Sequence, residues 1–221
     1  MIDKNSPFKL FVEGKDDLAV VTHVVARHDP LLAYHVIEHE NPDENPENRY
    51  HGIERIVKKL QVRLKIADFR ALGIMVDADY SESGAGFRKR WDAFRRILSA
   101  AGYEPPDGPS TAGLVLEKDG RHAGVWIMPN NTDDGMLENF IGSLISSEDT
   151  LWPRATHCVD SIPLADRKFA EIHRQKALAH TWLAWQKDPG KPFGVAIQKK
   201  YLDATSAPAK ALYDWLGRLF A

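Results

Sequence analysis

Short apolar runs alternate along the chain with stretches of helical periodicity. Buried strands are predicted at 8–12, 33–37 and 72–76, where β-forming residues cluster. Amphipathic helices are predicted at about 16–27, 53–64 and 87–101, where apolar residues recur every three to four positions. This alternation predicts an α/β fold, with a mainly parallel sheet and helices on both faces.

In the second half of the chain the strand–helix alternation gives way to a predicted hairpin followed by helices. Asp119-Gly120 lies between β-rich segments at 111–116 and 123–128, which predicts a hairpin. Helices are predicted at 136–145, 166–186 and 207–220. We expect residues 1–150 to form a catalytic core and residues 151–221 a mostly helical C-terminal extension packed on the same domain. A weak boundary is expected near 153–163, and the polar segment 41–50, with two prolines, is predicted to be a mobile loop.

Composition narrows the class of protein. The chain has 221 residues, a formal net charge of −2 and one cysteine, Cys158. One cysteine excludes an internal disulfide or a zinc cage of cysteines, and the near-neutral charge argues against nonspecific coating by nucleic acid. Neither a signal peptide nor a membrane span is evident in the apolar pattern, so we expect a cytoplasmic protein that does not bind membranes.

Acidic residues follow two of the predicted strands. Glu13 ends the first strand, and Asp77 and Asp79 end the third. In an extended chain two residues at i and i+2 point to the same side, and Asp17 lies one helical turn after Glu13. Such carboxylates form a hard oxygen site that suits Mg²⁺ or Mn²⁺. The alternative is that Asp-Ala-Asp begins a loop and Glu13 caps a helix, but two strands ending in acid favour the metal site.

These motifs resemble the Toprim domain of primases, topoisomerases and OLD-family nucleases. The resemblance lies in Leu10-Phe11-Val12-Glu13-Gly14 followed by Ile74-Met75-Val76-Asp77-Ala78-Asp79. Asp17, Gly135-Met136-Leu137-Glu138 and a strand running into Met128-Pro129-Asn130 are similar to a small stand-alone Toprim-like family related to OLD nucleases. No Gly-rich phosphate loop of the ATPase type is present, so the ATPase half of OLD proteins is missing.

The resemblance implies a set of site residues. The metal ligands would be Glu13, Asp17, Asp77, Asp79 and Glu138. Glu13 would also serve as general base or acid if one ion binds, and Lys176 would stabilise the transition state. Two alternatives stay open: Glu138 as a helix N-terminal acid, and Lys176 as a lysine that merely extends along an apolar stripe.

Basic residues near the acidic motifs are candidates for binding nucleic acid. They are Lys15, Arg88, Lys89 and Arg95. A phosphate-tracking surface would suit a nuclease, whereas a solvated helix face would need no function. The resemblance therefore implies a Mg²⁺- or Mn²⁺-dependent nuclease acting on DNA or RNA, with a protein partner that could supply target recognition. The alternatives are a non-catalytic Toprim-fold module that binds nucleic acid or a nucleotide, and a small-molecule phosphohydrolase.

Overall fold

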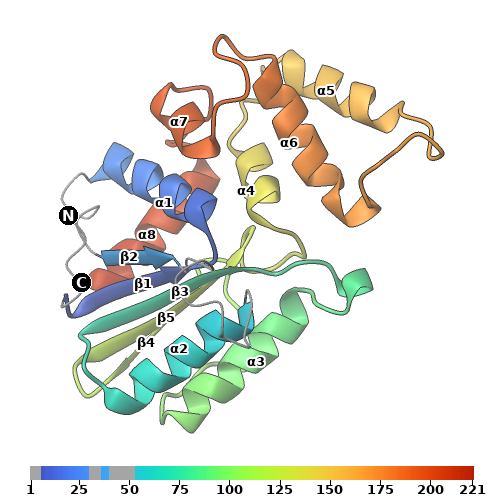
Figure 1. The fold of residues 1–221 in the computed structure, drawn as a ribbon. Coiled ribbons are helices and arrows are strands. Elements are labelled where there is room, and N and C mark those ends of the chain that lie inside the picture. Colours follow the sequence, from blue (N-terminus) through green and yellow to red (C-terminus); the bar gives the residue numbers. More distant parts are fainter. Residues whose placement is uncertain (1–5, 30–35, 40–52) are drawn as a thin grey trace, which may run out of the picture.

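A computed structural model describes residues 6–29, 36–39 and 53–221 (Figure 1). Within these residues, five strands form one sheet in the order β2-β1-β3-β5-β4. They are β1 (Phe8–Val12), β2 (Val36–His39), β3 (Ala71–Asp77), β4 (Leu114–Lys118) and β5 (Arg121–Met128). All neighbouring strands are parallel except β4 and β5, which are antiparallel. The predicted α/β class with a mainly parallel sheet is confirmed.

Helices cover both faces of the sheet (Figure 1). Helices α2 (Ile53–Ile66) and α3 (Phe87–Ala100) lie on one face, and α1 (Lys15–His28) and α8 (Ala207–Phe220) lie on the other. Because β3 is covered on both sides, its first six residues are all buried. The apolar stripe that predicts α2 faces the sheet. Ile56, Leu60 and Leu64 are buried, and Ile53 and Val57 pack partly buried against the same cluster.

The remaining helices follow the sheet's last strand. They are α4 (Leu137–Ser143), α5 (Leu151–Asp160), α6 (Arg174–Ala184) and α7 (Phe193–Gln198), with a short 3₁₀ turn, η4 (Glu171–His173), just before α6. Another 3₁₀ turn, η3 (Ser81–Ser83), follows β3. The α5–α6 pair stands beyond α4, away from the sheet, while α7 packs on α1 (Figure 1). One hydrophobic cluster joins residues from β1 through α8, and the division at residue 150 stays a prediction. None of the helices in the described ranges is both long and apolar enough to cross a membrane.

Three helices differ from the sequence expectation. Helix α5 occupies the segment expected to hold a boundary, and it tolerates Pro153 because proline in the first helical turn sacrifices no intrahelical bond. Asp149 Oδ1 caps this helix by accepting from the backbone N–H groups of Leu151 and Trp152, at 2.8 and 2.6 Å. Helix α6 begins at Arg174 rather than at residue 166, and α7 was not predicted at all. Of the expected strand at 33–37, residues 33–35 lie outside the described residues, as does the predicted loop at 41–50.

The predicted hairpin is tighter than the sequence pattern suggested. Strands β4 and β5 extend to the turn itself, with Lys118 paired to Arg121. Asp119 and Gly120 both have positive φ, 51° and 70°. Positive φ at both central residues is the signature of a two-residue type I′ turn, which matches the twist of the flanking strands. Gly102, the predicted stop of α3, also has positive φ, at 82°.

Gly113, just before β4, generates the first prediction. Its φ is +74°, and a Cβ built there would lie 2.7 Å from Trp215 Cδ1 and 2.9 Å from Trp126 Cε3. Gly113→Ala should therefore lower the free energy of unfolding by about 2–4 kcal/mol, combining left-handed strain with overpacking against two rings. Gly120→Ala, at φ +70° with open space around it, should cost only about 1–2 kcal/mol. Urea unfolding of both variants measures the difference, and equal losses would contradict the clash.

Candidate metal centre

The candidate site lies where β1 and β3 end. These two strands are parallel neighbours, with Val12 opposite Met75, so Glu13 and Asp77 emerge at the same edge of the sheet. The Asp77 backbone N–H donates to Glu13 Oε1 at 2.9 Å. This bond joins residues 64 positions apart in sequence and brings the two strand-end acids together, as the parallel topology predicts.

Asp17 returns to this edge because of its place in α1. Gly14 is the N-cap residue, and its N–H donates to Asp17 Oδ2 at 3.0 Å. This is the reciprocal half of a capping box, in which a side chain at the third helical position folds back to the start of the helix. Asp17 is buried as a result, with 8% of its surface exposed.

Helix α4 contributes Glu138, at its second residue. The backbone N–H of Leu137 donates to Asp77 Oδ1 at 2.9 Å, which fixes the start of α4 against the end of β3. Glu138 is 6% exposed. Lys176 reaches it from α6, with its Nζ 3.4 Å from Glu138 Oε1 and about half of the lysine side chain exposed. Both residues thus lie on the side of the molecule where Asp77 emerges.

Asp79 differs from the expectation. The argument for its orientation assumed an extended chain, but β3 ends at Asp77 and Asp79 has φ +58°. Its backbone forms a two-bond antiparallel bridge with Gly135, at 2.8 and 2.9 Å. Its Oδ2 accepts from the Arg90 guanidinium at 2.6 Å, so the carboxylate is engaged by an arginine. The extended-chain argument is therefore wrong for Asp79, while its role as a ligand stays a prediction.

Arg90 was absent from the predicted site residues. Besides Asp79 it contacts the end of β3, where its Nε donates to the Asp77 carbonyl at 3.3 Å. A signal for it exists in the sequence: Arg90 lies three residues after Phe87 and four before Phe94, both on the buried stripe of α3. That spacing places it beside the sheet, unlike Arg88 and Lys89 in the same basic run.

A second set of polar contacts holds the loops around the site. Asp134 accepts from the backbone N–H groups of Ser81, at 2.8 Å, and Phe87, at 2.7 Å. The Tyr80 hydroxyl donates to Asn139 Oδ1 at 3.0 Å. These bonds fasten the segment after β3 to the segment before α4, and they make Asp134 a loop anchor.

The buried acids perturb one another. Burial raises the pKa of Asp77 well above its ordinary value, and the charges of Asp17, Glu13 and Glu138 raise it further. Burial, helped by the Glu13 charge, raises the pKa of Asp17 to about 7. Burial also raises the pKa of Glu13, against the lowering effect of its bond from the Asp77 N–H. The site therefore concentrates more negative charge than its own environment neutralises.

The chemistry of this donor set fits a hard divalent cation. Each of Glu13, Asp17 and Asp77 uses one carboxylate oxygen on a backbone N–H and retains another for a ligand. In the parts of the chain that the structure describes, however, no three His, Cys, Asp or Glu side chains are already arranged to hold a metal ion. Coordination would thus require side-chain rotation from the positions seen here. Carboxylates without cysteine or histidine suit Mg²⁺ or Mn²⁺.

Three of the four predicted basic residues lie apart from the strand-end acids. Arg88 pairs with Asp92 at 3.4 Å, Lys89 donates to the carbonyl of Gly84, and Arg95 pairs with Asp107 at 2.9 Å. Arg95 also lines a hollow of about 560 Å³ on the outer side of α3. Lys15 is exposed at the first position of α1, two residues after Glu13. The structure thus brings Lys15 near the site and directs the other three to their own neighbours.

The fold and site define a mixed α/β protein with buried carboxylates at the carboxyl edge of a parallel sheet. The chain belongs to the family described as "Protein of unknown function (DUF3226)", whose model matches residues 7–221. No curated protein and no solved structure matches the chain.

Asp17 generates a prediction about pH. Its pKa rises from an ordinary 3.8 to about 7 on folding, so between these values the folded protein holds a proton that the unfolded chain releases. Stability should therefore be highest below about pH 4, fall as pH rises from there to about 7 in a chelating buffer, and level off above that. Asp17→Asn keeps an acceptor for the Gly14 N–H but removes the charge. It should raise the free energy of unfolding at pH 8 by on the order of 1–3 kcal/mol, and at pH 5 by roughly a third as much.

Urea unfolding at the two pH values checks this expectation. Asp16→Asn is the matched control, because Asp16 is exposed in the same helical turn. If Asp17→Asn and wild type lost the same stability between pH 5 and pH 8, the buried charge would not be the cause.

Proposed function

We propose that this protein is a Mg²⁺- or Mn²⁺-dependent phosphodiesterase that acts on nucleic acid, of the OLD-like Toprim nuclease type. The observation that carries the proposal is the meeting of Glu13 and Asp77 at the ends of adjacent parallel strands, joined by a 2.9 Å bond. The buried Asp17 and Glu138 lie close enough to raise the pKa of Asp77 by charge. The mainly parallel sheet is also the arrangement that the Toprim resemblance implies.

The donor set assigns roles to the chain's own residues. Glu13, Asp17, Asp77 and Glu138 would hold the cation, and Asp79 would join them if its pair with Arg90 opened. When bound, the cation would neutralise charge on phosphoryl oxygens and lower the pKa of a water nucleophile. Lys176, half exposed beside Glu138, would contact the phosphate and stabilise the negative charge that develops on the phosphate in the transition state. Arg90 would orient the end of β3 through the Asp77 carbonyl and the Asp79 carboxylate.

Substrate and setting follow from the same proposal. The substrate would be DNA or RNA, with Lys15 and the α3 cations Arg88, Lys89 and Arg95 along its path. Since the formal net charge is −2, bulk charge would not attract a polyanion, and a protein partner would supply target recognition. The cytoplasm is the proposed location.

Asp77→Asn tests the metal centre. The new amide oxygen can still accept from the Leu137 N–H, but the ligand charge is lost, so cleavage should fall on the order of 100-fold or more and Mn²⁺ affinity should fall with it. The measurements are plasmid nicking and oligonucleotide degradation with Mg²⁺ or Mn²⁺, and calorimetric titration with Mn²⁺. Asp214→Asn, an exposed acid paired with Lys210 on α8, should behave like wild type.

The outcomes separate the alternatives. Cleavage undiminished in Asp77→Asn would refute the assignment. Retention of nucleic acid in a gel shift, without turnover in any divalent ion and without loss in Asp77→Asn, would favour the binding module. Hydrolysis of p-nitrophenyl phosphate with neither polymer cut would favour a small-molecule phosphohydrolase.

Lys176→Ala distinguishes a phosphate-contacting lysine from a surface one. Its loss should lower kcat about 10–100-fold, because a cation that faces the reacting phosphate is removed. The Mn²⁺ affinity should hold or increase, since a competing cation leaves Glu138. Lys210→Ala, which removes an exposed α8 lysine, is the control. Equal kcat in the two variants would assign Lys176 a structural role only.

A further inference from the structure

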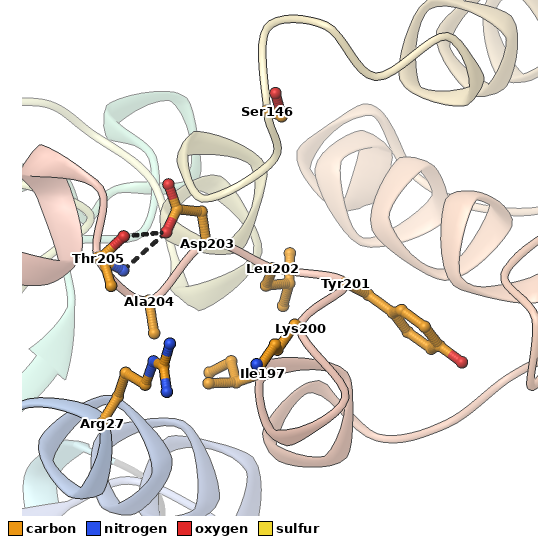
Figure 2. Close-up of a pocket in the computed structure, with 9 residues that line it drawn as sticks. All are labelled: Arg27, Ser146, Ile197, Lys200, Tyr201, Leu202, Asp203, Ala204 and Thr205. Atoms are coloured by element: carbon orange, nitrogen blue, oxygen red, sulfur yellow. Dashed lines mark hydrogen bonds between the residues drawn. The ribbon is translucent and has the colours of Figure 1, made fainter.

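A second polar cleft lies at the far end of α1 from the candidate metal centre (Figure 2). It has a volume of about 230 Å³. The end of α1, the end of α7, the segment that joins α7 to α8 and a residue after α4 form its walls. The lining residues are Arg27, Ser146, Ile197, Lys200, Tyr201, Leu202, Asp203, Ala204 and Thr205. Arg27 follows Asp17 by ten residues on the same helix, which separates the two sites by about 15 Å.

Two cationic side chains line this cleft. The guanidinium of Arg27 and the amine of Lys200 come from different elements and end in the same opening (Figure 2). Asp203 is the one acid in the lining, and Figure 2 shows its carboxylate turned toward Thr205. Asp203 Oδ1 accepts from the Thr205 N–H at 2.8 Å and from the Thr205 hydroxyl at 2.6 Å. The lining therefore carries a net positive charge.

Lys200 occupies a backbone position that favours glycine. It follows α7 with φ +61°, where its N–H donates to the Ile197 carbonyl and the Tyr201 N–H donates to the Ala196 carbonyl, both at 2.9 Å. This is the helix-terminating geometry in which glycine is common, because a Cβ is disfavoured in the left-handed region. The chain nevertheless carries a lysine here, at a cost in backbone free energy.

We propose that this cleft is a binding site for a phosphate group. Phosphate offers several oxygens and up to two negative charges, which match one planar guanidinium that binds two oxygens and one ammonium that acts as a point charge. The hydroxyl of Ser146 adds a neutral donor at the wall. The volume is smaller than the roughly 300–1,000 Å³ of pockets for drug-sized ligands, so the cleft fits the phosphate itself, free or at the end of a nucleic-acid strand. This inference does not depend on the proposed nuclease activity.

The experiment is calorimetric titration of the full chain in a chelating buffer without divalent ions. Under these conditions the acidic centre repels phosphate, so failure of the cleft and failure of the nuclease proposal are separate results. Inorganic phosphate should bind saturably. Lys200→Gly and Arg27→Gln should each weaken binding about tenfold or more, as expected for loss of a charge-assisted hydrogen bond. Lys199→Gln is the matched control, because Lys199 pairs with Asp188 at 2.8 Å outside the cleft, and its affinity should equal that of wild type.

Thermal unfolding of Lys200→Gly separates a loss of phosphate binding from a loss of folding. Glycine relieves the left-handed strain, so the Tm of this variant should not fall even though phosphate binding is lost. Titration with 5′-phosphorylated and unphosphorylated oligonucleotides identifies the source of the phosphate. Preference for the phosphorylated strand, abolished in Lys200→Gly, would assign a strand end, and binding of inorganic phosphate alone would assign the free anion. Absence of saturable phosphate binding, or equal affinity in all four proteins, would overturn the proposal.

Discussion

Mutual repulsion among buried carboxylates is the constraint around which the carboxyl edge of this sheet is built. The pKa values of Asp77 and Asp17 rise first because burial disfavours their charged forms, and further because the neighbouring acids repel them. Nearby cationic side chains alone do not neutralise these carboxylates. Backbone N–H groups hold one oxygen each of Glu13, Asp17 and Asp77, and Arg90 holds Asp79. Such an arrangement is costly without a cation, and binding one would require these side chains to rotate.

The hydrogen bonds that orient the acids also join β1, β3 and α4. Glu13 accepts from the backbone at the end of β3, and Asp77 accepts from the backbone at the start of α4. The bridge between Asp79 and Gly135 then pairs the loop after β3 with the loop before α4. Site residues therefore supply the long-range contacts that position α4, and α6 packs on α4 in turn. For this reason isosteric amides are more informative substitutions than alanine at these positions.

Local signals in the sequence predicted most of the sheet and the core of the site. Short apolar runs predicted β1 and β3, and apolar residues at helical spacing predicted α1. The parallel pairing of β1 and β3 then required Glu13 and Asp77 to share an edge of the sheet. The features that were missed depend on partners distant in sequence. Asp79 adopts positive φ because Gly135 pairs with its backbone, and Arg90 becomes a site residue because that turn presents Asp79 to it. Helix α5 was obscured by Pro153, since proline weakens a helical pattern even where the first turn tolerates it.

Helix α1 connects two sites of opposite charge, the acidic centre and the cationic cleft. Its first turn carries Asp17 beside the acids, and its last turn carries Arg27 in the cationic cleft, an order that also suits the helix dipole. Helix α4 makes a second connection, because the Leu144 carbonyl at its end accepts from the Asp203 N–H in the cleft wall at 2.8 Å. Under the two proposals, the cleft would attract an anion without a cation, whereas the acidic centre would attract one only after a cation has bound.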